Sequence, residues 1–147
     1  MTVPVDPDLP AAGLGRRLLA LVYDAILVTV LLMAGTGLAL ALHHGHLDVH
    51  HPLFRAYLFN LWFFFIAFFW VHRGQTPGMR AWRLRVQRQD GFPIGWTQAL
   101  LRFLGGLVSA AALGLGYLWV LGPARLAWHD RFSQSRVVVL PPPGRGR

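Results

Sequence analysis

Three long apolar blocks, separated by short polar segments, dominate the hydrophobic pattern of the chain. The first runs from Leu18 to Leu42 and contains a single charged residue, Asp24. As a helix it would be roughly 37 Å long, enough to cross a hydrocarbon core of about 30 Å with some tilt. The second block covers about 53–71, and the third about 97–121. The pattern therefore predicts an all-α integral membrane protein with three hydrophobic segments.

Glycines interrupt the third block, at Gly105-Gly106 and in "LGLGY" at 113–117. Such a segment breaks or packs closely more readily than the other two. If it returns the chain to its starting side, every arginine except Arg55 lies on the N-terminal side of the membrane. The positive-inside rule then makes that side cytoplasmic. The sequence thus favours a broken or re-entrant third segment, with a simple third crossing as the alternative.

Two short stretches have strand character. "WRLRV" at 82–86 alternates in side-chain type and could turn at Asp90-Gly91 into "FPI" at 92–94. "SRVVVL" at 135–140 also has the composition of a strand but has no neighbouring partner in sequence, so it would have to pair with 82–86. We therefore expect a small cytoplasmic β-hairpin or strand element beside the helices.

The domain organisation follows from these blocks. Residues 1–15, rich in proline, are expected to form a flexible cytosolic tail, and 16–140 a single transmembrane domain. Residues 141–147 are expected to be a disordered Pro/Arg tail. A cleaved signal peptide is the weaker reading of the first block, because the block is much longer than a 7–15-residue signal core and contains Asp24.

Composition and charge narrow the classes of function. The chain has 147 residues, is 54% hydrophobic and carries a net charge of +8. Its arginines flank the apolar blocks, so membrane topology and anionic lipid head groups explain the charge better than nucleic acid does. The absence of cysteine excludes disulfides, thiolate catalysis and Cys-ligated zinc or iron–sulfur sites. No cofactor is expected.

Asp24 is the main candidate for chemistry within the membrane. An unpaired carboxylate at membrane depth costs on the order of 2.5–3.5 kcal/mol on insertion scales. Arg17 lies two helical turns earlier on the same face, and Arg102 enters the third block from the cytoplasmic side. We therefore expect Asp24 to pair with Arg17 and Arg102, although Arg102 could instead extend to lipid phosphates.

The histidines suggest little further chemistry. The loop 43–55 combines imidazoles with Asp48, a ligand set that suits zinc, copper or nickel, but no helical spacing fixes the set. A solvated loop is the simpler reading, and weak metal binding is the alternative. His129-Asp130 resembles half of a catalytic dyad, yet neighbouring residues on a helix do not face each other, so no enzyme is expected. The weak metal candidates are His43, His44, His46, His50 and His51.

Motifs along nearly the whole chain resemble the RDD family of small bacterial membrane proteins, named for an arginine and two aspartates. "RLLALVYD" at 17–24 matches the family's opening pattern, and "LLR" at 100–102 its entry to the last segment. "GQTPGMRAWRLRV" at 74–86 and "WHDRFSQSRVVV" at 128–139 match its middle and closing signatures. The supporting motif residues are Gly74, Gln75, Thr76, Gly78, His129 and Arg131, with Asp130 as the second aspartate; Met79 and Arg136 depart from the residues that many relatives have, Lys and Thr.

The resemblance implies a multi-pass protein of the bacterial inner membrane but does not settle its activity, and the positive-inside rule places the N-terminus on the cytoplasmic side. In one hypothesis Arg17, Asp24, Arg102 and Asp130 form a structural ion network, and the protein is an accessory or assembly partner in contact with lipids, other membrane proteins or further copies of itself. In the alternative, the protein is a small oligomeric transporter in which Asp24 exchanges H⁺ for a cation such as Na⁺.

Overall fold

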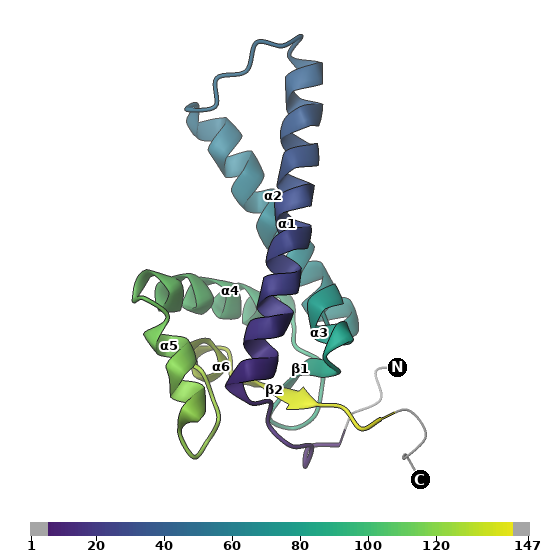
Figure 1. Ribbon diagram of the computed structural model, residues 1–147, viewed down its shortest axis with the longest axis vertical. Coiled ribbons are helices and arrows are strands. Elements are labelled where there is room, and N and C mark those ends of the chain that lie inside the picture. Colours follow the sequence, from purple (N-terminus) through teal and green to yellow (C-terminus); the bar gives the residue numbers. More distant parts are fainter. Residues whose placement is uncertain (1–5, 143–147) are drawn as a thin grey trace.

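A helical hairpin stands on a compact lobe of short helices and two strands in the computed structural model, which describes residues 6–142 (Figure 1). The two helices of the hairpin are the longest elements, and every other element belongs to the lobe. In chain order the elements are α1 (Leu14–Leu42), α2 (Pro52–Arg73), α3 (Pro77–Ala81), β1 (Leu84–Arg88), α4 (Trp96–Ala111), α5 (Leu115–Leu118), the 3-10 helix η1 (Trp119–Leu121), α6 (Trp128–Phe132) and β2 (Ser135–Val139).

Helices α1 and α2 are each long and apolar enough to cross a membrane, as the first two blocks predict. Only 11% of the residues in each hydrophobic window are buried within the chain, so most of their surface is left for lipid or protein partners. The helices meet closely at Gly35, where a Cβ would overlap the Leu61 side chain. The Tyr57 hydroxyl donates a hydrogen bond to the Gly35 carbonyl oxygen over 3.3 Å.

The third block is broken, which agrees with the glycine pattern. Helix α4 and the following α5–η1 segment are bent by 108°. Leu113 and Gly114 at the break both have left-handed backbone conformations, with φ values of 57° and 79°. Helix α4 runs across the foot of the hairpin and does not extend it (Figure 1). The described chain therefore has two candidate spans, or three if the bent pair counts as one.

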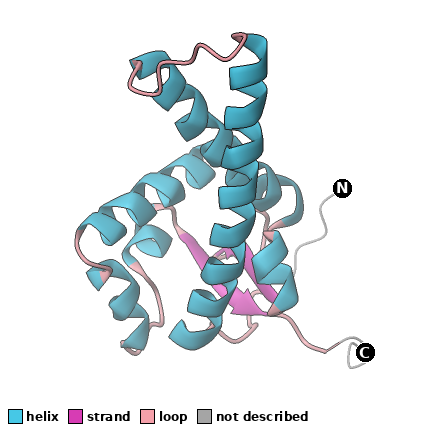
Figure 2. Ribbon diagram, turned by 45° about the horizontal axis from the view of Figure 1, so that its top comes forward, coloured by secondary structure: helices cyan, strands magenta, loops and turns pink. Residues whose placement is uncertain are grey.

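The two predicted strands pair with each other. β1 and β2 are antiparallel, with Leu84 opposite Val139 and Arg88 opposite Ser135 (Figure 2). The predicted hairpin into 92–94 is wrong, because no strand forms there; the Phe92 carbonyl accepts from the Arg88 amide, and the Phe92 amide donates to Asp90 Oδ1.

The N-terminal segment is more ordered than the sequence suggests. Ala11 forms a bridge with Val138, and the Ala12 amide donates to the Val137 carbonyl over 2.9 Å. Ala12 is fully buried. The prediction of a flexible tail over 1–15 is therefore wrong for residues 10–12; residues 1–5, and most of the predicted tail 141–147, lie outside the described residues.

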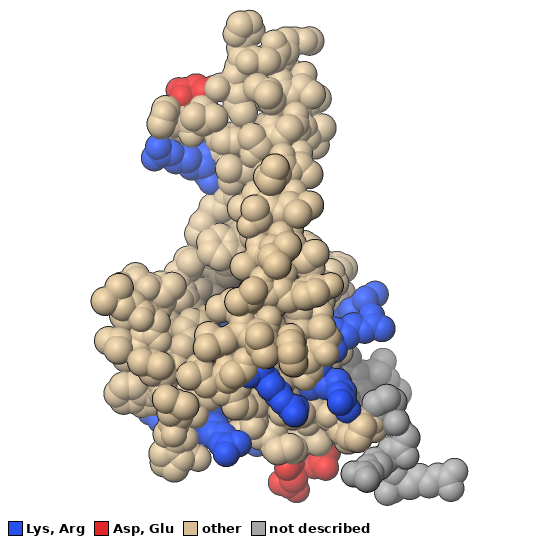
Figure 3. Space-filling view, viewed as in Figure 1, with Lys and Arg blue, Asp and Glu red and all other residues tan. Residues whose placement is uncertain are grey.

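This pairing fixes which segments share an end of the hairpin. Because β2 lies between β1 and residues 10–12, the start of α1, the loop after α2 and the C-terminal strand all lie in the lobe. Arginines gather on the lobe, one basic and one acidic side chain lie near the tip of the hairpin, and the visible surface between these two ends carries no charged residue (Figure 3). The third segment thus returns the chain to its starting end.

Candidate functional site: two buried carboxylates

Asp130 forms the centre of a buried ion network. It lies in the short helix α6 and is fully buried. Arg17 Nη1 donates to its Oδ2 over 2.5 Å, and Arg102 Nη1 donates to its Oδ1 over 2.5 Å. The Ala127 amide adds a third hydrogen bond to Oδ2 over 3.0 Å, which caps the start of α6. One carboxylate thus joins α1, α4 and α6.

The two arginines are themselves held by further contacts. Arg17 Nε donates to the Ala12 carbonyl over 3.1 Å, and its Nη2 donates to the Arg125 carbonyl over 3.0 Å. Arg102 Nη1 donates to the Ser135 hydroxyl over 2.9 Å. Its guanidinium carbon lies 5.3 Å from the centre of the Trp70 ring, a distance typical of a cation–π contact. The network therefore reaches α2, β2 and the N-terminal segment as well.

Electrostatics at this site keep Asp130 ionised and His129 neutral. Burial alone would raise the pKa of Asp130, but the positive charges of Arg102 and Arg17 outweigh it and hold that pKa below its usual range. Burial, with the nearby Arg102 charge, lowers the pKa of His129 to about 3. His129 Nε2 lies 3.7 Å from Asp130 Oδ1, a distance too long for a hydrogen bond. The pair has no geometry for a catalytic dyad.

Asp24 has different partners from those that the sequence predicts. Its side chain is buried, yet within residues 6–142 no salt bridge joins it to an arginine, because Arg17 and Arg102 both bind Asp130. The Thr76 hydroxyl donates to Asp24 Oδ2, and the Gly78 amide donates to Oδ1 over 2.8 Å. The predicted pairing of Asp24 with the two arginines is therefore wrong.

The segment 74–78, which follows α2, positions these two donors. Gly74 ends α2 in a left-handed conformation, and Gln75 donates to the Leu84 carbonyl over 2.7 Å. Thr76 then caps the start of α3, with Pro77 as the first helical residue. A Cβ at Gly78 would collide with the Ala20 carbonyl oxygen and lie 2.8 Å from the Asp24 carboxyl carbon, so this position needs glycine.

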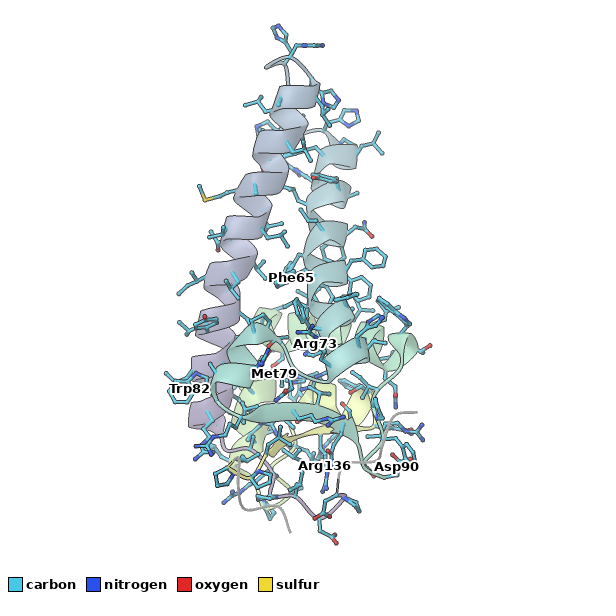
Figure 4. The ribbon with its side chains drawn as sticks, turned by 90° about the vertical axis from the view of Figure 1, so that its right-hand side faces the viewer. Phe65, Arg73, Met79, Trp82, Asp90 and Arg136 are labelled. Carbon is cyan, nitrogen blue, oxygen red and sulfur yellow. The ribbon has the colours of Figure 1, made fainter. Side chains whose placement is uncertain are left out.

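A cavity of about 260 Å³ lies between the hairpin and the lobe, next to Asp24 and to the arginines that bind Asp130. Both network arginines and Asp24 line it, with His129 and Tyr117. Most of the remaining lining is apolar and comes from α1, α2 and α4, including Trp62, Ile66, Phe103 and Leu107. Met79 also lines the cavity and lies on α3 where hairpin and lobe meet, whereas Asp90 and Arg136 lie at the foot of the lobe (Figure 4).

The histidine loop does not gather into a metal site. Among residues 6–142 no group of three His or Asp side chains could hold a metal ion. His43 Nδ1 instead bonds to the Ala39 carbonyl, and His51 Nδ1 accepts from the Leu53 amide to cap α2. His50 Nδ1 lies 3.2 Å from Arg55. His44 and His46 are exposed, and the metal candidate is not supported by this geometry.

Comparison with known families identifies the chain. The family model described as the RDD family matches residues 11–134. The chain belongs to the RDD family. Neither a curated protein nor a solved structure matches it. The matched range begins at the segment that pairs with β2 and ends just before that strand.

Within this RDD chain, the arginine and two aspartates divide between two sites. Arg17 and Asp130 meet directly, whereas Asp24 binds the supporting motif. Arg131 is exposed and lies outside both. The network also includes Trp70, Ser135 and Ala12. Nothing in their local sequence predicts that they contact the two arginines. Thr76 was identifiable as a partner for an acid, since Thr-Pro-Gly is a helix start that presents free amides.

Proposed function

We propose that this RDD protein is a structural or accessory component of the bacterial inner membrane, held together by Arg17, Arg102 and Asp130. The observation that carries this proposal is that the oxygens of both buried carboxylates accept hydrogen bonds from the chain itself. A group already bonded on both oxygens is suited to holding elements together. Burying such a network is a common way to fix one arrangement of helices.

In this proposal α1 and α2 cross the membrane, and the lobe lies at the cytoplasmic face. The arginines at the lobe support this orientation through the positive-inside rule. Cysteine labelling tests it, since the natural chain has no cysteine. With Cys introduced singly at Ser133 and at His46, an impermeant thiol reagent applied to intact cells should label only the His46 variant. Because Ser133 is buried, its labelling in permeabilised, partly denatured cells is the required control.

The partner is proposed to be another membrane protein or a second copy, bound through the exposed face of the hairpin. Met33 is 69% exposed on α1, whereas Val28 on the same helix is 8% exposed. In a homo-oligomer packed on this face, Met33→Cys should form a disulfide-linked dimer in membranes under mild oxidation, and Val28→Cys should not. Absence of a dimer from cysteines placed at several exposed α1 positions would argue against self-association.

Cation or proton transport is the second candidate, and one observation favours it. Asp24 lines the cavity and has no arginine partner among the described residues, so a positive charge does not hold it permanently ionised. Its oxygens bond only to a hydroxyl and an amide, which a cation or proton could compete with. A carboxylate of this kind within a span is a recognised feature of proton-coupled transporters.

Exchange measurements in proteoliposomes separate the two functions. The full chain is reconstituted with a pH-sensitive dye, and Na⁺ is added under an imposed pH gradient. The accessory function predicts no exchange above protein-free vesicles. Transport predicts exchange that Asp24→Asn abolishes and Asp90→Asn, a change at an exposed acid, leaves intact. Equal exchange in all three proteins would exclude Asp24 as the transport site.

A further inference from the structure

The cavity between hairpin and lobe has an apolar entrance. Two of its lining residues are exposed at the surface, Leu21 on α1 (46%) and Ala110 on α4, so the cavity opens beside these apolar side chains. Both residues belong to helices that are candidate membrane segments. A ligand that enters between them comes from the apolar layer around the hairpin, so it must itself be partly apolar.

Three residues that line the cavity carry a buried side-chain nitrogen without a hydrogen-bond partner. Trp70 Nε1, Arg102 Nε and His129 Nδ1 are buried without a partner, and all three residues line the cavity. The first two atoms can only donate, and buried donors are seldom left unpaired in folded proteins. Arg102 and His129 are at most 5% exposed, so water reaches them poorly.

The two carboxylates near these donors are already used as acceptors. Both oxygens of Asp24 bind Thr76 and Gly78, and those of Asp130 bind the two arginines. A ligand that satisfies the free Trp70 and Arg102 donors therefore brings acceptor oxygens, and the apolar lining favours one that also has an apolar part. Small rotations of the indole and the guanidinium would aim their free N–H groups at such oxygens.

We propose that this cavity binds the phosphodiester end of a membrane phospholipid, with its oxygens on Trp70 and Arg102 and its first methylenes against Ile66, Phe103 and Leu107. Phosphate oxygens are strong acceptors for guanidinium donors. The volume of about 260 Å³ is just below the roughly 300–1,000 Å³ typical of small-molecule sites. It holds the head of a lipid, whose chains leave through the entrance between Leu21 and Ala110. This site goes beyond the structural function proposed above.

Native mass spectrometry of the full chain, released from detergent, tests the proposal. The protein is titrated with dioleoylphosphatidylglycerol, with dioleoylglycerol, which has the same chains without the phosphodiester, and with inorganic phosphate. Gly106→Leu fills the cavity, since Gly106 lines it and a Cβ there meets only the Tyr117 hydroxyl, at 3.7 Å. Gly37→Leu is the matched control, because nothing lies within 4 Å of a Cβ at that position.

The phospholipid should remain bound to the natural chain and to Gly37→Leu, and Gly106→Leu should lower the bound fraction at least tenfold. Trp70→Phe keeps an aromatic ring but removes one donor, so it should weaken binding about fivefold. If Gly106→Leu fails to fold, weaker phospholipid binding by Trp70→Phe still tests whether the cavity is the binding site. Equal retention of dioleoylglycerol, displacement of the lipid by millimolar phosphate, or retention unchanged in both cavity variants would each overturn the proposal.

Discussion

The two buried acids of this chain are held in opposite ways. Asp130, in the lobe, is fully buried and binds two guanidinium groups, whereas Asp24, in helix α1, is 6% exposed and binds a hydroxyl and an amide. Removing a partner from a buried ion pair costs about 3–5 kcal/mol, while a hydrogen bond to a charged group contributes about 1.5–3 kcal/mol. The acid of the lobe is thus held by charged donors, and the acid of helix α1 by neutral donors.

The largest expected effect is at Asp130. Asp130→Asn would leave Arg17 and Arg102 buried without a counter-charge, and we expect it to lower the free energy of unfolding by about 3–5 kcal/mol. Thermal unfolding in detergent and the yield of monodisperse protein measure this loss. Asp90→Asn is the control, since the Asp90–Arg88 pair is exposed and should contribute under about 1 kcal/mol. If both variants lost a similar free energy of unfolding, the buried pairs of Asp130 would contribute no more than the exposed Asp90–Arg88 pair.

The close approach at Gly78 gives the next largest effect. Gly78→Ala introduces a Cβ that collides with the Ala20 carbonyl and crowds Asp24, so we expect a loss of about 1–3 kcal/mol. Gly13→Ala provides the control, because a Cβ there meets nothing within 4 Å. Chemical unfolding of both variants compares them. If Gly78→Ala is as stable as Gly13→Ala, α3 does not pack on Asp24 as described.

Stability should also depend on pH through His129. Its pKa is about 3 in the folded chain and about 6.5 when unfolded, so the unfolded state binds the extra proton between these values. The free energy of unfolding is therefore not reduced by His129 above about pH 6.5. Below that pH it declines, by at most about 1.4 kcal/mol per pH unit. Asp130, whose pKa is also depressed, adds a loss only at lower pH, through the ordinary range of a carboxyl group.

Unfolding curves from pH 7.5 to 5 measure this slope. His129→Gln removes the titrating group, so it should reduce the slope by about one proton. An identical slope in the natural chain and in His129→Gln would mean that His129 takes up its proton without unfolding the lobe.

The smallest expected effect tests directly which partner Asp24 has. A double-mutant cycle between Asp24→Asn and Thr76→Val should show a coupling of about 1 kcal/mol, because the two side chains share a hydrogen bond. The same cycle between Asp24→Asn and Arg17→Gln should show less than about 0.5 kcal/mol. A larger coupling with Arg17 than with Thr76 would restore the pairing that the helix spacing predicted.

Sequence reasoning succeeded where the signal is local or periodic. The apolar blocks predicted the two long helices, the glycines predicted the break near residue 113, and the β-branched composition of 135–139 predicted a strand that pairs with β1. The helices and the break depend on the residues of one segment. The strand pairing depends on the one other stretch with strand character.

The ion pairing could not be predicted in the same way. Arg17 and Asp24 share a helical face, but an acid 113 residues further along the chain occupies the Arg17 guanidinium. Whether a buried arginine prefers the near or the distant carboxylate depends on the packing of α6, β2 and residues 10–12, and none of these contacts leaves a periodic pattern. The correct family motif was found, yet its charged residues divide between two sites.

The pairing of residues 10–12 with β2 also sets the order in which the molecule can be completed. During synthesis α1 leaves the ribosome while Asp130 and β2 do not yet exist, so Arg17 must wait for its counter-charge until nearly the whole chain has been made. Such distant contacts close slowly. A nascent chain halted before residue 130 would lack the counter-charge for both the Arg17 and the Arg102 guanidinium groups.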